Sequence, residues 1–140
     1  MVRCTLTQTI GRPPAAVFKA ITDLRTFPDW NPTTKAAAKL TDGPVGEGTR
    51  FELAVRGFGR TVQELREFQA DRQVRLVPLS RSFTGGHRFV LRASGASTVV
   101  AHELELHPRG LLRLMAPMLG PMMRKNLHAT AAALKEYVER

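Results

Sequence analysis

Two histidines in the second half of the chain carry the chemistry that is easiest to define from the sequence. If residues 94–97 form the turn of a β-hairpin, His102 lies opposite Phe89, and His87 lies on the same face nearer a strand end. Imidazole titrates near neutral pH, so a histidine beside a bound molecule can donate a hydrogen bond, orient a carbonyl or act as a general base. His102 is the candidate catalytic residue, because its mid-hairpin position encloses it more. The alternative is that both histidines make only structural hydrogen bonds.

The rest of the sequence carries no second catalytic constellation. It has no nucleophile elbow, phosphate-binding loop or paired zinc-ligand motif. Asp23 and Asp29 fall at expected helix ends, where a carboxylate caps the backbone, and Glu103 and Glu105 fall on the strand face assigned to solvent. The lone Cys4 cannot form an internal disulfide and has no second thiol at metal-ligand spacing. We therefore expect no metal and no cofactor, and the sequence leaves enzyme activity open.

The methionines point to a hollow that accepts ligands. All four internal ones, Met115, Met118, Met122 and Met123, fall in one short stretch near the C-terminus. Leu111, Met115, Met118 and Met122 recur at the spacing of one helix face, whereas Met123 lies one step off that stripe. Methionine is flexible and polarizable, so a cluster of it packs loosely and adapts to irregular apolar shapes. The cluster predicts a deformable cavity beneath this helix.

Hydrophobic periodicity predicts the elements that position these side chains. Residues 2–10 alternate as a first strand, the Pro13–Pro14 pair begins a short helix, and a further turn places Phe27 and Trp30 on one side. Six strand-like runs punctuated by glycine and proline follow, at about 35–41, 48–56, 60–69, 73–78, 83–92 and 98–107. Short connections between sequential strands favour an antiparallel meander. The hairpin around residues 57–59 has no unique register and stays open.

The last part of the chain, from Gly110 onward, is patterned as helix. Its second half continues the helical spacing through Leu127, Ala131, Leu134 and Val138. Pro117 and Pro121 each remove an amide donor and clash with the backbone one turn back. We therefore expect a kink or break between these prolines and an unbroken helix from about Met122 to Tyr137.

Length, composition and charge bound the class of protein. At 140 residues the chain fits a single domain, 1–140, and its 43% hydrophobic and 24% charged content is ordinary for a globular protein. The net charge of +9 is spread along the chain, with no basic block longer than Arg124–Lys125, which argues against nucleic-acid binding. Residues 1–8 do not form an export signal, and the uncharged run Leu114–Met123 is far shorter than the about 20 residues that span a bilayer. We expect a cytoplasmic monomer or homodimer without stable membrane insertion.

Three stretches of this sequence resemble a known superfamily. They are Val17-Phe18 to Trp30-Asn31-Pro32, then Gly46-Glu47-Gly48-Thr49, and finally Leu134-Lys135-Glu136-Tyr137-Val138-Glu139. With the order of elements, they resemble the START-like superfamily (SRPBCC) of polyketide cyclases, lipid-transfer proteins and pollen-allergen-type carriers. The resemblance implies an α+β helix-grip fold, in which a curved six- or seven-stranded antiparallel sheet wraps around a long C-terminal helix. Two short helices follow the first strand, and an elongated apolar cavity separates the sheet from the long helix.

In that architecture the concave sheet face and the inner stripe of the last helix line the cavity, with Trp30 near its mouth. The candidate ligand-binding residues are Trp30, Phe51, Leu53, Val55, Phe89, Leu91, Val100, His102, Leu104, Met115, Met118, Leu119 and Met122. The alternative is that this set packs a solid core.

The leading functional hypothesis is binding or transport of a hydrophobic small molecule, namely a lipid, a polyketide or an aromatic metabolite. A second hypothesis is a polyketide cyclase, aromatase or dehydratase in which His102 assists proton transfer. A third is a protein-interaction module that uses the groove beside the last helix. A large exposed apolar patch in place of a closed cavity favours the third.

Overall fold

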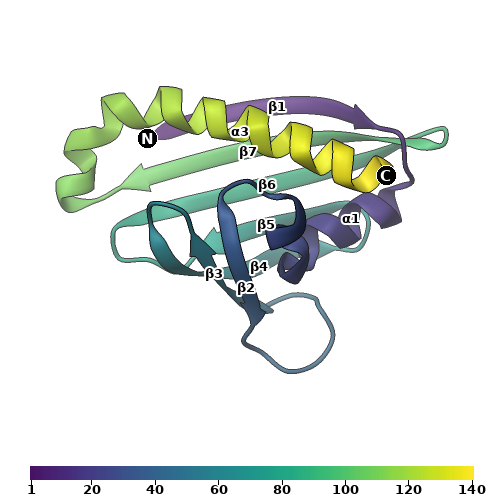
Figure 1. Cartoon of the computed structure of the whole chain (residues 1–140), viewed down its shortest axis with the longest axis horizontal. Coiled ribbons are helices and arrows are strands. Elements are labelled where there is room, and N and C mark those ends of the chain that lie inside the picture. The colour runs from purple at the N-terminus through teal and green to yellow at the C-terminus, as the bar shows by residue number, and fades with distance from the viewer.

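The computed structural model describes residues 1–140 and shows a seven-stranded antiparallel sheet with a long C-terminal helix beside it (Figure 1). The strands are β1 (Val2–Ile10), β2 (Thr34–Lys39), β3 (Arg50–Val55), β4 (Gly59–Gln69), β5 (Gln73–Pro78), β6 (Phe83–Ser94) and β7 (Ser97–Pro108). The helices are α1 (Pro14–Thr22), the 3₁₀ helix η1 (Leu24–Thr26), α2 (Phe27–Trp30), the 3₁₀ helix η2 (Gly110–Met115) and α3 (Ala116–Glu139). The α+β helix-grip fold expected from the sequence is confirmed.

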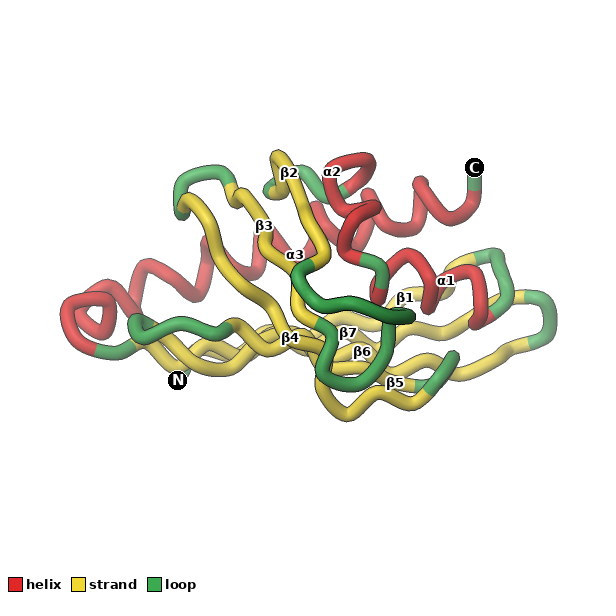
Figure 2. The backbone as a smooth tube through the Cα atoms, turned by 90° about the horizontal axis from the view of Figure 1, so that it is seen from below, coloured by secondary structure: helices red, strands yellow, loops and turns green.

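The sheet follows a simple order that brings the two ends of the chain together. The strands are arranged β1-β7-β6-β5-β4-β3-β2, so the first strand pairs with the last and the others form a meander. Figure 1 shows α3 running alongside β1 and β7. Seen from the side, β2 and β3 turn up from the plane of β5, β6 and β7 towards the helices (Figure 2). The curved sheet therefore covers α3 from below and from one side. No helix combines the length and the apolar character needed to cross a membrane.

The register of the β6–β7 hairpin is the one predicted from alternation. Phe89 lies opposite His102, and Arg88 lies opposite Glu103. Arg88 and Glu103 do not pair with each other: the guanidinium of Arg88 pairs with Glu67 at 3.0 Å, and Glu103 pairs with Arg3 at 2.8 Å. Alternation therefore determined the register, while the neighbouring strands decided which charges meet.

The hairpin left open by the sequence also has a defined register. In the β3–β4 pair, Val55 lies opposite Gly59 and Arg50 lies opposite Glu64. The Arg50 Nε donates to Glu64 Oε2 at 2.7 Å, and Arg66 also contacts this buried carboxylate. These hydrogen bonds from arginine, led by that from Arg50, hold the pKa of the Glu64 carboxyl below its usual value. The register thus places a buried acid between two cations.

Two consecutive glycines allow β6 to pass between its neighbours. Gly85 and Gly86 have φ angles of 120° and 125°, a region that residues with a Cβ rarely adopt. A Cβ on Gly85 would overlap the carbonyl oxygen of Glu105 in β7, and one on Gly86 would overlap the carbonyl oxygen of Leu76 in β5. Glycine is therefore required here both by backbone conformation and by space. The residue that follows is His87.

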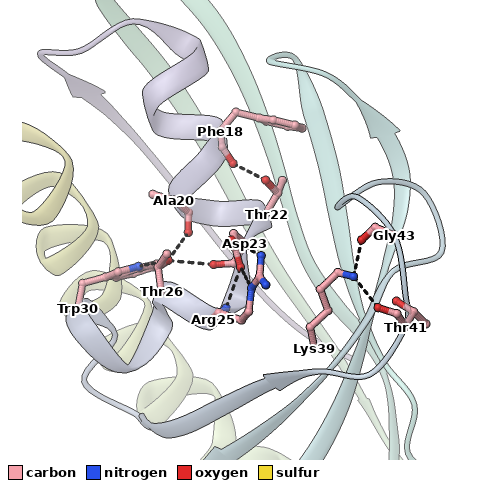
Figure 3. A network of polar contacts seen from close by, with 10 residues as sticks. All are labelled: Phe18, Ala20, Thr22, Asp23, Arg25, Thr26, Trp30, Lys39, Thr41 and Gly43. Carbon is pink, nitrogen blue, oxygen red and sulfur yellow. Dashed lines mark hydrogen bonds and ion pairs between the residues drawn. The ribbon is translucent and has the colours of Figure 1, made fainter.

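Local hydrogen bonds hold the short helices that follow β1 (Figure 3). The Asp23 carboxylate accepts from the backbone and side chain of Arg25, which lowers its pKa, so Asp23 has the helix-end role expected for it. The Thr26 hydroxyl donates to the Ala20 and Asp23 carbonyls and accepts from Trp30 Nε1 at 3.3 Å. Trp30 also packs edge-on against Phe27, with ring centroids 4.9 Å apart. These contacts anchor Trp30 in the core.

Of the kink or break expected between Pro117 and Pro121, the break is wrong, because α3 runs without interruption from Ala116 to Glu139. Pro117 lies in the first turn, where no amide donor is needed, and Pro121 removes only one intrahelical hydrogen bond. The interruption comes earlier, where the 3₁₀ helix η2 gives way to α3 at Met115.

Two hydrophobic clusters lie between the helices and the sheet. The larger has 18 buried residues and joins β1, the short helices and the sheet to Leu134 and Val138 in the second half of α3. The smaller has four buried residues, Cys4, Leu119, Met123 and Leu127, between β1 and the first half of α3. The first half of α3 therefore packs in the smaller cluster and the second half in the larger one.

Candidate functional site: an apolar pocket beside a histidine pair

A pocket of about 210 Å³ lies beside the first half of α3, with walls from β3 to β7, η2 and the α2–β2 connection. Twelve of its 22 lining residues are hydrophobic, so an apolar ligand would find mostly apolar contacts. Glu105 is the one lining residue with a carboxylate, and no lysine or arginine lines the pocket. The wall is apolar with a few polar groups.

Five of the residues predicted to bind a ligand line this pocket: Leu53, Val55, Leu104, Leu119 and Met122. They come from β3, β7 and α3, which are far apart in sequence. The sheet face and the last helix therefore both contribute predicted residues to the wall of one pocket.

Six other predicted residues do not line the pocket and are buried in the interior: Trp30, Phe51, Phe89, Leu91, Val100 and His102. The first five belong to the larger cluster, where they pack against one another and against the short helices. For these five the solid-core alternative describes the packing. A strand that lines a pocket and a strand that packs in a solid core both have an apolar inner face. The alternation of apolar and polar residues could therefore not tell pocket residues from core residues.

The placement expected for two methionines is wrong. Met115 and Met118 are 47% and 71% exposed and do not line the pocket, whereas Met123 is only 7% exposed and lines it. The predicted stripe was counted through Leu111 and Met115, which lie in the tighter 3₁₀ helix η2, so the α-helical spacing does not carry over into α3. Counting back by four from the buried Leu127 reaches Met123 and Leu119, and this signal was present in the sequence.

The two histidines form a pair. His87 Nδ1 and His102 Nε2 lie 2.8 Å apart, so one ring donates a hydrogen bond to the other. The His102 ring stacks on Phe89, with ring centroids 4.0 Å apart, and is only 4% exposed. His87 lines the pocket, and His102 lies behind it. Of the two, His87 and not the favoured His102 is the ring that a ligand can reach.

Burial keeps both imidazoles neutral. Desolvation lowers the pKa of His87 to about 4, and desolvation together with the neighbouring His87 lowers the pKa of His102 well below its usual value. Because a neutral imidazole has one N–H, the tautomers of the two rings are coupled. When His87 Nδ1 donates to His102, its Nε2 is a hydrogen-bond acceptor; when it accepts, its Nε2 is a donor. His87 Nε2 can therefore offer a ligand either a hydrogen-bond donor or a hydrogen-bond acceptor.

Two polar side chains that sequence reasoning missed also line the pocket. Thr61 Oγ1 and Gln63 Oε1 are buried and make no hydrogen bond to another group of the protein. Both lie on β4, two residues apart, on the same face as the fully buried Leu65. The sequence held one indication of them: some of the possible registers of the β3–β4 hairpin would bury a polar residue. The structure contains no group of three or more His, Cys, Asp or Glu placed to hold a metal ion.

Comparison with known proteins gives the class of this fold. The chain is similar to a START superfamily protein from Mycobacterium smegmatis (21% identity, TM-score 0.74, covering 98% of this chain and 97% of that one). It is also similar to the protein TTHA0849 from Thermus thermophilus (17% identity, TM-score 0.79, 97% and 96% covered). A third similar structure is the Zhui aromatase/cyclase from Streptomyces sp. R1128 (17% identity, TM-score 0.74, 99% and 93% covered). No curated protein sequence matches the chain.

A curved sheet gripping a long helix is the fold that the chain shares with these three structures. The sequence pattern described as "Polyketide cyclase / dehydrase and lipid transport" matches residues 1–139, and the chain belongs to that family. This family and fold are compatible with hydrophobic ligand binding and with polyketide cyclase activity.

Proposed function

We propose that the protein binds a hydrophobic small molecule in the pocket between its sheet and α3. The observation that carries this proposal is the lining itself, which is mainly apolar and includes the adaptable side chains of Met122 and Met123. Burying apolar ligand surface contributes about 25 cal/mol per Å² before the costs of association. The description of the family, which names lipid transport, supports the same function.

Native mass spectrometry, with extraction of whatever co-purifies, tests the proposal directly. A matched pair of variants then places the ligand. Met122→Trp adds bulk to the pocket wall, whereas Met118→Trp adds the same bulk on the exposed side of α3. We expect the first to weaken binding of the extracted molecule at least about tenfold and the second to leave it unchanged. Equal binding by both variants, or no bound molecule and no uptake of any apolar probe, contradicts the proposal.

The histidine pair favours a second candidate, a cyclase or dehydratase acting on a poly-carbonyl chain. A neutral imidazole at the pocket wall can accept a proton from a carbon between two carbonyls, and His102 would orient His87 as a positioning residue. His87→Ala separates the two candidates, because a carrier keeps its ligand whereas a cyclase loses turnover of a trial poly-carbonyl substrate. If no trial substrate is turned over by the unaltered protein, the cyclase candidate fails.

The remaining expectations are part of this proposal. A cytoplasmic location rests on the single, buried thiol of Cys4. Absence of nucleic-acid binding rests on the lack of a long basic block, and gel-shift assays would check it. Whether the protein is a monomer or a homodimer is measured by sedimentation.

A further inference from the structure

We propose that the ligand is a neutral, hydroxyl-bearing apolar molecule of about two rings, recognised by Thr61 and Gln63 on β4. This inference rests on the proposed function, and it names the class of ligand. It starts from two buried oxygen atoms, Thr61 Oγ1 and Gln63 Oε1, that make no hydrogen bond within the protein and belong to residues that line the pocket.

The two side chains form a short polar strip on β4, in a lining that also includes the polar side chains of Asn31, Thr33, His87 and Asn126. Residues two apart on a strand share a face, so Thr61 and Gln63 point the same way. Their partners on β3 are Leu53 and Phe51, which offer no side-chain hydrogen bonds. The other walls of the pocket include the apolar Met122 and Met123. A ligand in the pocket is therefore the group best placed to satisfy the strip.

The strip selects between ligands because burying Thr61 and Gln63 under a ligand that offers them no hydrogen bond costs free energy. Water that enters the free pocket can hydrogen bond to both side chains. A purely apolar ligand expels that water and leaves the buried oxygens without partners, which is costly. A hydroxyl group both donates and accepts, so it matches the Thr61 hydroxyl and either end of the Gln63 amide. The neutral His87, also at the wall, adds a further donor or acceptor.

The charge of the wall excludes an anionic ligand. The chain carries a net charge of +9, which by itself would favour anions. No lysine or arginine lines the pocket, however, and the one charged lining residue is the carboxylate of Glu105. Glu105 alternates with the lining residues Leu104 and Leu106 on β7, and its carboxylate pairs with Arg3 at 4.0 Å. A carboxylate drawn into the pocket would lose its hydration and find no cation. The pocket therefore favours an alcohol or phenol over a fatty acid.

The size of the pocket limits the ligand further. An apolar cavity of about 150 Å³ holds a benzene molecule. The pocket here measures about 210 Å³, which suits a two-ring molecule. We therefore choose 2-naphthol, 2-methylnaphthalene and 2-naphthoate as probes, because they share one ring system and differ in the group at one position.

Isothermal titration calorimetry with these three probes tests the inference. At pH 7 we expect 2-naphthol to bind about tenfold or more tightly than 2-methylnaphthalene, and 2-naphthoate to bind most weakly. Gln63→Leu and Thr61→Val should weaken the binding of 2-naphthol and strengthen that of 2-methylnaphthalene. The controls are Gln69→Leu, on the exposed end of the same strand, and Thr7→Val, exposed on β1, and both should bind like the unaltered protein.

The thermal unfolding midpoint of each variant, measured without ligand, shows whether weaker binding is caused by misfolding. Removing a buried group without a partner should keep or raise the midpoint of Gln63→Leu, so weaker 2-naphthol binding by a stable variant is a specific effect. Equal binding of the hydroxylated and methylated probes, blocked by Met122→Trp, would overturn this inference and leave the proposed function standing. If none of the three probes binds the unaltered protein, this inference is overturned; the proposed function falls with it only if, in addition, no molecule co-purifies and no other apolar probe is taken up.

A separate observation concerns the outer side of η2 and the start of α3. Leu111, Leu114 and Met118 are 85%, 80% and 71% exposed, and the two leucines are the most exposed large hydrophobic side chains of the molecule. We call these three residues the apolar patch. Large exposed apolar groups gathered in one place mark interaction sites. The patch adjoins the pocket, because Leu112 and Met122 in the same segment line it.

We further propose that the apolar patch docks on an anionic lipid surface. Residues 106–135 contain Arg109, Arg113, Arg124, Lys125 and Lys135 and no aspartate or glutamate. Exposed leucine and methionine on a segment with only positive charges are typical of helices that lie in a membrane interface. Docking there brings the pocket to a source of apolar molecules without any segment crossing the bilayer.

Vesicle flotation tests this docking. We expect the protein to float with vesicles of about 30% phosphatidylglycerol in phosphatidylcholine, and not with phosphatidylcholine alone or in high salt, because screening removes the attraction of the basic residues. The double variant Leu111→Gln/Leu114→Gln should lose flotation, whereas Leu40→Gln, which replaces a leucine that is 51% exposed before β3, should keep it. Absence of flotation, or a dimer in solution that the double variant dissociates, overturns the proposal.

Discussion

At the scale of single residues, position in the sheet changed the chemistry of the two histidines. Burial lowers the pKa of both rings, and for His102 the neighbouring His87 adds to this, so neither acts as a cation near pH 7. His87 reaches the pocket and His102 supports it from behind. The polar oxygens of Thr61 and Gln63 give the same pocket its specificity in our proposal.

The histidine pair predicts a loss of stability in weak acid. The pKa of His87 is lowered to about 4 in the folded protein, whereas an unfolded histidine titrates near 6.5. Between these values the unfolded state binds the extra proton, so stability is highest above pH 6.5 and falls as the pH drops towards 4. From about pH 7.5 to about pH 5, His87 alone should cost about 2 kcal/mol of unfolding free energy, measured by urea denaturation.

The control for this acid effect is a histidine outside the pair. His87→Asn, whose amide can keep the hydrogen bond to His102, should lose a large part of the pH dependence, and the exposed His128→Asn should keep all of it. Carboxylates with lowered pKa values, such as Glu64, stay ionised at about pH 5 and do not confuse the comparison. Identical pH profiles for the two variants would refute the assignment.

Two methionines of α3 should differ sharply when truncated. Met123 is buried against Leu119 and Leu127, and Met123→Ala should lower the unfolding free energy by about 2–4 kcal/mol. Met118 is 71% exposed, and Met118→Ala should change it by less than about 0.5 kcal/mol. Urea denaturation measures both values. A larger effect at Met118 would mean that the helix is rotated relative to the structure.

At the scale of elements, β6 and α3 depend on exceptions to regular geometry. Strand β6 passes between β5 and β7 at Gly85 and Gly86, where no side chain fits. Helix α3 tolerates Pro121 because the proline lies near its start and costs one hydrogen bond. The 3₁₀ helix η2 ends at Met115, and within α3 Met123 shares the buried face of Leu119 and Leu127.

Gly86→Ala should prevent the sheet from forming as described. The added Cβ would overlap the carbonyl oxygen of Leu76, and the φ of 125° disfavours any L side chain. We expect a loss of more than about 4 kcal/mol, seen as an unfolded protein by circular dichroism. Gly43→Ala is the matched control, because its φ is also positive, at 87°, but its Cβ would meet nothing within 4 Å. That variant should lose only about 1–2 kcal/mol; comparable losses at both sites would argue against the close approach of β5 and β6.

At the scale of the whole molecule, buried surface is distributed unevenly. The 18-residue cluster holds the second half of α3, whereas the four-residue cluster holds its first half beside the pocket. A segment with few buried contacts opens locally at lower free energy than the global unfolding reaction. Because the smaller cluster lies beside the pocket, we expect this half of α3 to open first, which would suit the entry of a ligand.

Hydrogen exchange measured by mass spectrometry should report this difference. Amides in residues 118–125 should exchange faster than those in residues 130–138, because the latter open only with the larger cluster. Saturating 2-naphthol should slow exchange in the first segment and leave the second unchanged. Equal protection of the two halves before ligand is added would show that α3 opens as one unit.

Local periodicity in the sequence determined the secondary structure, the β6–β7 register and the inner face of the second half of α3. It could do so because each depends on residues near one another in the chain, such as Phe89 and His102 across a short turn. The family resemblance added the helix-grip arrangement.

Only the tertiary structure decided which inward side chains meet a hollow and which meet one another. Phe51 and Leu53 lie two residues apart on β3 and both point inward, yet Leu53 lines the pocket and Phe51 is fully buried in the core. The difference depends on the distance between α3 and the sheet, which η2, the Gly85–Gly86 pair and the curvature of the strands set together. Periodicity gives each residue a direction but no distance to the opposite wall, so the pocket and its pair of unsatisfied oxygens emerge only when the elements are packed.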